Sequence, residues 1–105
     1  MNKKGLILAS LITFACEDSK DTSPPSVSII SPTESSSVSE IALIQCVASD
    51  NDSVRIVELW IDSLATGLTD SSKPYEFYWN TVLLSDSTEY SLMAMAEDMS
   101  NNISF

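Results

Sequence analysis

The sequence contains no histidine, the residue that most often acts as a general base or binds a transition metal. A Ser-His-Asp triad, a Cys-His pair and a histidine-ligated metal site are therefore excluded. Only two of the 105 residues are glycine, so the glycine-rich loops that cradle phosphate groups are absent. Five Lys and Arg stand against fifteen Asp and Glu, which gives a formal net charge of -10. Because nucleic acids bind basic surfaces, this balance predicts no nucleic-acid partner.

Cysteine is also scarce, with Cys16 and Cys46 as the two examples in the chain. Cys46 falls on the apolar face of a predicted strand, whereas Cys16 falls in a predicted cleavage motif. We therefore expect no disulfide within the folded domain, whose stability would then depend on packing. A reactive thiol needs a nearby base or cation. We predict instead that Cys46 is a small buried hydrophobic residue.

The first residues have the pattern of an export signal. Lys3 and Lys4 precede an apolar run from Gly5 to Ala15, which is typical of a secretory signal peptide. The run is shorter than the roughly 20 apolar residues that a membrane-spanning helix needs. Cys16 follows at once, and the segment resembles a bacterial lipoprotein signal, in which this cysteine becomes the lipidated first residue. The alternative is cleavage near Ala15 without a lipid.

A polar stretch separates this signal from the rest of the chain. Residues 17–26 read EDSKDTSPPS, with two adjacent prolines and no aliphatic or aromatic side chain. Such a stretch cannot bury apolar surface, so we predict an extended tether. The predicted organisation is a signal peptide over residues 1–15, a lipidated Cys16 with its tether over 16–26, and one folded domain over 27–105. The protein is then exported and anchored to a membrane of the cell envelope.

From Val27 onward, apolar residues recur with a period of two, which is typical of strands that are buried on one face. The segment 89–97 is also rich in Leu, Met, Ala and Glu, which favour helices, but its alternation favours a strand. Short strands at this spacing predict an all-β sandwich. The predicted strands cover Val27–Ile29, Ile41–Ser49, Val54–Asp62, Tyr75–Trp79 and Glu89–Glu97, with a short connecting strand at best over Thr66–Leu68 and a last strand that starts at Ile103.

Four blocks of sequence resemble the bacterial immunoglobulin-like repeat. They read PPSVSIISPTESSSVSE, IALIQCVASDNDSVRIVELWIDS, KPYEFYWNT and YSLMAMAEDMSNN. The resemblance implies an Ig-like antiparallel β-sandwich of about seven short strands, and it is unspecific for function. The family usually has glycine where this chain has Ser53, Ser63 and Asn101. Its last strand also continues further beyond Asn102 than here, so we expect the last strand to be short or truncated.

Acidic and amide side chains gather in two predicted loops. Asp50 and Asp52 lie in one loop, and Asp98 and Asn101 lie in another. In an Ig-like sandwich these loops lie at the same end, and their side chains offer the oxygen ligands that Ca²⁺ prefers. We therefore hypothesise a calcium site and expect no other cofactor. The alternative is that these residues bond their own backbones in turns.

A second candidate site lies on the outward face of the strand that begins at Val54. Ile56, Glu58 and Trp60 share this face, and an aromatic ring beside an acid can bind sugars or proteins. Alternatively, these side chains cover a neighbouring strand. Further apolar residues face outward, and such surfaces often mark contacts with partners. They are Ile41, Leu43 and Val47, together with Met93 and Met95.

These observations favour a non-catalytic module, because a sandwich of this size has little room for the concave site that catalysis needs. The first functional hypothesis is a membrane-anchored spacer, adhesion or protein-interaction domain. Its expected partners are the membrane, through the lipid, and other surface proteins or polysaccharide. The alternatives are a carbohydrate-binding module and the N-terminal fragment of a larger surface enzyme or adhesin.

Overall fold

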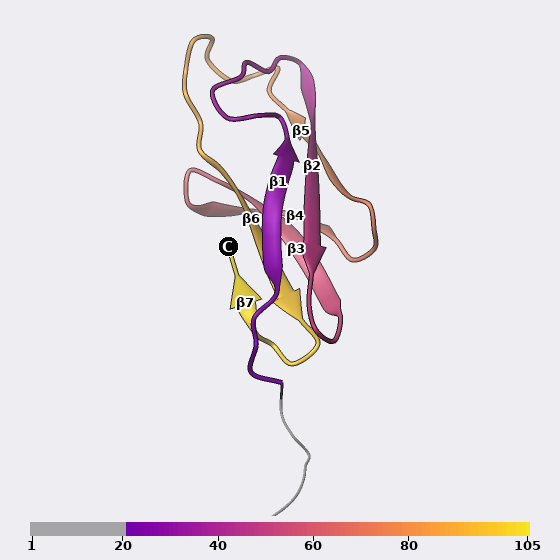
Figure 1. Ribbon diagram of the computed structural model, residues 1–105. Coiled ribbons are helices and arrows are strands. Elements are labelled where there is room, and N and C mark those ends of the chain that lie inside the picture. Colours follow the sequence, from indigo (N-terminus) through magenta and orange to yellow (C-terminus); the bar gives the residue numbers. More distant parts are fainter. Residues whose placement is uncertain (1–20) are drawn as a thin grey trace, which may run out of the picture.

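A computed structural model describes residues 21–105, which form two packed antiparallel sheets (Figure 1). The first sheet has three strands in the order β1-β2-β5, and the second has four in the order β4-β3-β6-β7. The predicted all-β sandwich of seven strands is confirmed. The strands are β1 (Ser26–Ser31), β2 (Ile41–Ser49), β3 (Val54–Ile61), β4 (Leu64–Asp70), β5 (Tyr75–Asn80), β6 (Leu92–Asp98) and β7 (Ile103–Ser104).

The predicted signal peptide and Cys16 lie outside the described residues. Within residues 21–105, no helix is long and apolar enough to cross a membrane.

The core lies between the two sheets and follows from the alternation of side chains along each strand. In β2, every second residue points inward, while Ile41 and Val47 on the other face are about half exposed. Ile44 of one sheet and Val57 and Leu59 of the other have no exposed surface. The core residues are Ala42, Ile44, Cys46, Ala48, Val57, Leu59, Tyr75, Phe77, Ala94 and Ala96.

Two elements bear on alternatives that the sequence left open. The segment around Ala94 and Ala96 is a strand, not a helix, because β6 pairs with β3 and β7 on its two sides. The predicted short connection at Thr66–Leu68 is the seven-residue strand β4, so that prediction was too short. Most of β4 is exposed, so no burial pattern marks it in the sequence. Its pairing with β3 holds it, helped by the Thr66 hydroxyl, which donates to the Leu59 carbonyl at 2.6 Å.

Serine occupies a turn position that favours glycine. Asp62 and Ser63 join β3 to β4 with φ values of 52° and 65°, as in a two-residue hairpin turn in which both residues are left-handed. Asn101 also has a positive φ, of 69°, which asparagine tolerates well. Ser53 does not have a positive φ. A serine at this position, where the family usually has glycine, therefore places no strain on the turn.

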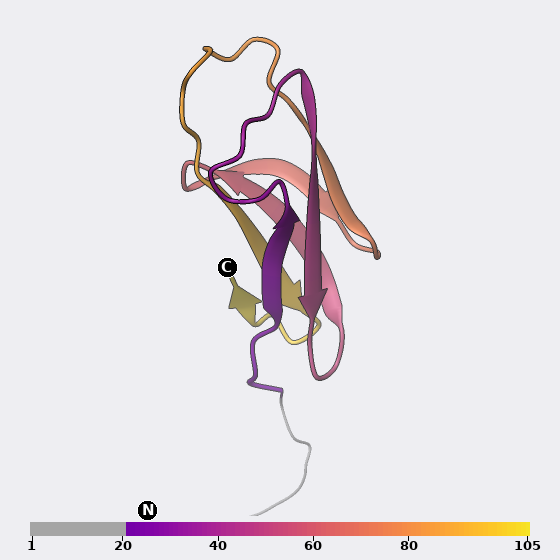
Figure 2. The ribbon, with the colours of Figure 1, turned by 45° about the horizontal axis from the view of Figure 1, so that its top comes forward.

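The sandwich has two distinct ends. The N-terminal segment enters beside the β2–β3 and β6–β7 loops, at the lower end in Figure 1. The β1–β2 loop and the long connection from β5 to β6 lie together at the opposite end in both views (Figure 2). A backbone bond of 2.7 Å from the Thr81 N–H to the Glu40 carbonyl joins these two segments. The last strand, β7, is short, as expected, and pairs with Ala96 and Glu97 of β6.

Leu59→Ala tests the packing of the two sheets. Leu59 has no exposed surface, so the shortened side chain leaves a cavity, and we expect the free energy of unfolding to fall by about 2–5 kcal/mol. Urea unfolding followed by tryptophan fluorescence measures the change. The matched control is Leu64→Ala, because Leu64 is 72% exposed and should change stability by no more than about 0.5 kcal/mol. Equal losses in the two variants would contradict this assignment of the core.

Ser63→Gly tests the strain in the β3–β4 turn. Removing the Cβ at a φ of 65° relieves the steric penalty, which exceeds the extra entropy that glycine loses on folding. We expect a net gain of roughly 0.5–1 kcal/mol in the free energy of unfolding. Ser53→Gly is the control, and it should show no gain because Ser53 does not have a positive φ. A gain in both variants would show that backbone strain is not the cause.

Candidate metal centre

Two loops meet at the end of the sandwich where the N-terminal segment enters. Asp50 follows β2, and Asp98 is the last residue of β6. Val54 pairs with Asp98 across the sheet, and the Met99 N–H donates to the Ser53 carbonyl at 3.2 Å. The loops that carry the predicted calcium ligands therefore lie side by side.

Asp98 is a buried carboxylate with a full set of donors. It has no exposed surface, and its Oδ1 accepts the Ser100 N–H at 2.9 Å and the Asn102 N–H at 2.8 Å. Its Oδ2 accepts the side-chain amide of Asn102 at 2.9 Å. Burial raises the pKa of Asp98, but the hydrogen bonds from Asn102 and Ser100 outweigh burial and hold the pKa below its usual value. Asp98 is therefore negatively charged at neutral pH.

Asp50 and Asp21 lie beside it, and each has one oxygen that receives no donor. Asp50 Oδ2 accepts the Asp52 N–H at 3.1 Å, whereas Asp50 Oδ1 is buried without a hydrogen-bond partner. Asp21 Oδ1 accepts the Ser23 N–H at 3.0 Å and the Asn51 amide at 3.2 Å, whereas Asp21 Oδ2 is buried without a partner. A buried oxygen that no group satisfies is costly. Turn formation alone therefore does not account for these two carboxylates.

The geometry of the three carboxylates suits one hard cation. One oxygen from each of Asp21, Asp50 and Asp98 lies within 4.8 Å of the others. Calcium binds oxygen at about 2.3–2.6 Å, so two ligands on opposite sides of the ion are up to about 5 Å apart. Carboxylate oxygens are also the ligand type that calcium prefers. The residues present therefore fit a Ca²⁺ ion held between the two loops and the N-terminal segment.

This group of three differs in part from the predicted set. Asp50 and Asp98 are brought together as expected. The carboxylate of Asp52 is exposed and is not one of the three, although its N–H bonds to Asp50. Asn101 is exposed too, and its N–H bonds to the Asp98 carbonyl at 3.2 Å.

Sequence reasoning missed Asp21, because it assigned residues 17–26 to the tether. It could have been found by assuming the antiparallel pairing of β1 with β2. In the structure this pairing places Ser26 opposite Ser49. The start of β1 therefore lies beside the end of β2. An acid shortly before β1 is then expected close to Asp50.

The predicted binding surface on β3 is partly covered. Ile56, Glu58 and Trp60 are all half-buried on the outer face of the four-stranded sheet. The Trp60 Nε1–H donates to Glu58 Oε1 at 3.2 Å, and the Phe105 ring packs edge-on against Trp60 with centroids 4.9 Å apart. Part of the indole is therefore occupied within the chain itself. Binding of sugar or protein at this surface stays a prediction.

The other outward apolar residues do not form one surface with the methionines. Ile41, Leu43 and Val47 are exposed on the three-stranded sheet, where Leu43 lies opposite Tyr78, which is 66% exposed. Met93 and Met95 lie opposite Trp60 and Glu58 on the outer face of the four-stranded sheet. The structure therefore separates into two faces what the sequence suggested as one partner surface.

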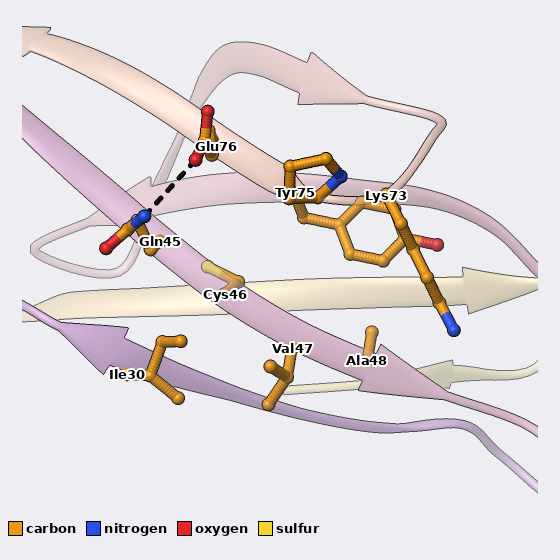
Figure 3. Close-up of a pocket in the computed structure, with 9 residues that line it drawn as sticks. Ile30, Gln45, Cys46, Val47, Ala48, Lys73, Tyr75 and Glu76 are labelled. Carbon is orange, nitrogen blue, oxygen red and sulfur yellow. Dashed lines mark hydrogen bonds between the residues drawn. The ribbon is translucent and has the colours of Figure 1, made fainter.

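A hollow of about 470 Å³ lies along β2 and the start of β5 (Figure 3). Among the side chains that line it, the Gln45 amide donates to Glu76 Oε2 at 3.2 Å, and Lys73 extends away from Glu76. Burial raises the pKa of Cys46, which also lines the hollow, to about 11. The thiol is therefore protonated at neutral pH and a poor nucleophile. Cys46 is 5% exposed, which confirms its expected role as a small buried residue.

Two antiparallel sheets packed face to face, with loops gathered at two ends, define an immunoglobulin-like module. The family model described as bacterial Ig domain matches residues 25–94, and the chain belongs to this family. The resemblance that the sequence suggested is confirmed. Domains of this class are typically non-catalytic.

Among solved structures, the chain is similar to fibronectin(III)-like modules of CbhA from Clostridium thermocellum. The TM-score is 0.70 and the identity is 23%, over 91% of this chain and 46% of the other. The chain thus spans about half the length of that structure, and the similarity supports the fold alone. No curated protein matches the chain.

Calcium binding predicts a gain in thermal stability. An extracellular site of millimolar to submillimolar affinity contributes about 1–2 kcal/mol at 5 mM Ca²⁺, or roughly 5–15 °C in melting temperature for a domain of this size. Calorimetry in CaCl₂ and in EGTA measures the difference, with NaCl at matched ionic strength as the control for screening. Asp50→Asn should remove most of the gain. Asp52→Asn should keep it, because that carboxylate lies outside the group of three. An unchanged melting temperature of the parent protein in CaCl₂ would contradict the site.

Proposed function

We propose that the protein is a non-catalytic surface module of an exported lipoprotein, which holds its domain away from the membrane as a spacer or interaction domain. The observation that carries this proposal is the separation of the two ends of the sandwich (Figure 1). The N-terminal segment enters at one end, and the β1–β2 loop and the β5–β6 connection lie at the other. A domain attached through Cys16 would present those distal segments outward.

The distal end has the chemistry of a contact surface. Val82 is 61% exposed and Leu83 is 95% exposed in the β5–β6 connection, so two large apolar side chains stand in solvent. Glu40 lies beside this connection, because its carbonyl accepts both the N–H and the hydroxyl of Thr81 at 2.7 Å. Exposed apolar residues of this kind often mark contacts with partners. An adhesion or protein-interaction role would use this end.

The same proposal includes a structural Ca²⁺ ion at the end near the anchor. Asp21, Asp50 and Asp98 would bind it, and the two buried oxygens without donors, Asp21 Oδ2 and Asp50 Oδ1, would become ligands. The ion would neutralise converging negative charge and hold two loops together. We assign it a structural role because its three ligands come from two loops and the N-terminal segment, which the ion would join.

The intact mass of the protein from a bacterial membrane fraction tests the anchor. We expect the mass of residues 16–105 with acyl chains on Cys16, because cleavage after Ala15 exposes that cysteine to lipidation. Cys16→Ser is the control, and it should release the protein from the membrane fraction without a change in folding. A parent protein recovered without acyl groups would overturn the anchoring. A much larger mass would mean that the module belongs to a longer surface protein.

A further inference from the structure

The candidate cation site includes a segment that precedes the first strand. Asp21 lies five residues before Ser26, where β1 begins, whereas Asp50 and Asp98 lie at the ends of core strands. Each loop contributes one bond to this segment. Asn51 donates to Asp21 Oδ1 at 3.2 Å, and the Asn102 amide donates to the Asp21 carbonyl at 3.0 Å. The segment is therefore held at both ends, by the bonds of Asp21 and by the buried Pro25, while residues 22–24 are exposed.

We propose that Ca²⁺ acts as a lock that fastens residues 21–24 to the loop end of the sandwich. The direction in which the domain leaves its N-terminal connection then depends on calcium. This inference rests on the calcium site of the proposed function, and it adds that Asp21 makes the site a switch for the tether.

The charge balance explains why the segment needs the ion. Asp98 is fully buried, and its carboxylate accepts N–H groups from Ser100 and Asn102. With Asp21 and Asp50 it brings three carboxylates within 4.8 Å, and like charges at this separation repel strongly where water is excluded. A cluster of acids alone would not indicate a ligand. Here, in addition, Asp21 Oδ2 and Asp50 Oδ1 are cut off from solvent and receive no hydrogen bond.

Of the three carboxylates, only that of Asp21 can leave at low cost. Moving Asp50 or Asp98 would disturb β2 or β6, which carry core residues. Residues 21–24 precede the buried Pro25 and belong to no strand, and two side-chain amide bonds attach Asp21 to the loops. Without a cation, repulsion is therefore relieved by release of the segment. With Ca²⁺, the same carboxylate becomes a ligand and the segment docks.

The test measures calcium affinity and the motion of the segment on one sample. We would titrate CaCl₂ into the ¹⁵N-labelled chain, purified in detergent micelles with its native N-terminus, by calorimetry. The heteronuclear NOE of the Thr22 and Ser23 amides would be recorded with CaCl₂ and with EGTA. We expect high NOE values with calcium and low values without it, because the segment docks only around the ion. Asp21→Asn should weaken calcium binding about tenfold or more and keep the NOE values low.

Asp52→Asn is the matched control, since it removes an equal charge from the same end and leaves the three carboxylates in place. It should retain both the affinity and the change in NOE. If the parent binds calcium and Asp21→Asn binds it equally well, the lock is overturned while the calcium site stands. Equal NOE values with CaCl₂ and with EGTA in a parent that binds calcium also overturn the lock alone. If the parent binds no calcium, both the lock and the calcium site fail.

Discussion

The buried carboxylate of Asp98 organises the end of the sandwich near the N-terminal segment. It has no contact with water, and three N–H groups from Ser100 and Asn102 replace that hydration. These bonds close the turn that places β7 against β6, and the Asn102 amide also reaches the backbone of Asp21. Because Asp98 is held in its charged form, each further carboxylate beside it needs compensation. The convergence of Asp21 and Asp50 at this point is therefore the strongest chemical signal in the molecule.

The rest of the domain depends on the contact between its two sheets. The thiol of Cys46 is buried and unpaired, so no disulfide involving it supports the described domain. Large side chains such as Tyr75 and Phe77 share one core with the small Ala94 and Ala96, and this complementarity fills the space between the sheets. Since this packing keeps the strands in place, it also fixes the positions of the loops. The candidate site is thus a consequence of strand register rather than of any local motif.

Strands that are buried on one face were predictable from the sequence. The boundaries of β2 agree with the prediction to the residue, since alternation from Ile41 to Ser49 is uninterrupted. The edge strand β4 was underestimated, because an exposed strand held by backbone pairing leaves no mark in side-chain polarity. Two of the four predicted calcium ligands lie together in the structure. Asp50 and Asp98 are adjacent, whereas Asp52 and Asn101 are exposed and bond to these two residues through their backbone N–H groups.

The sequence by itself determined the all-β class, the inward face of each main strand and the family. These depend on alternation within a strand and on short motifs, in which each residue is read against its close neighbours in the chain. Only the tertiary structure decided that Asp21 joins Asp50 and Asp98, and that Phe105 packs against Trp60. Such contacts link residues that are far apart in the chain, and they are set by how β1, β2, β3 and β6 align across two sheets. The physical reason is that a shift of one residue in register would turn Trp60 in β3 or Asp98 in β6 to the opposite face of its sheet, away from its partners.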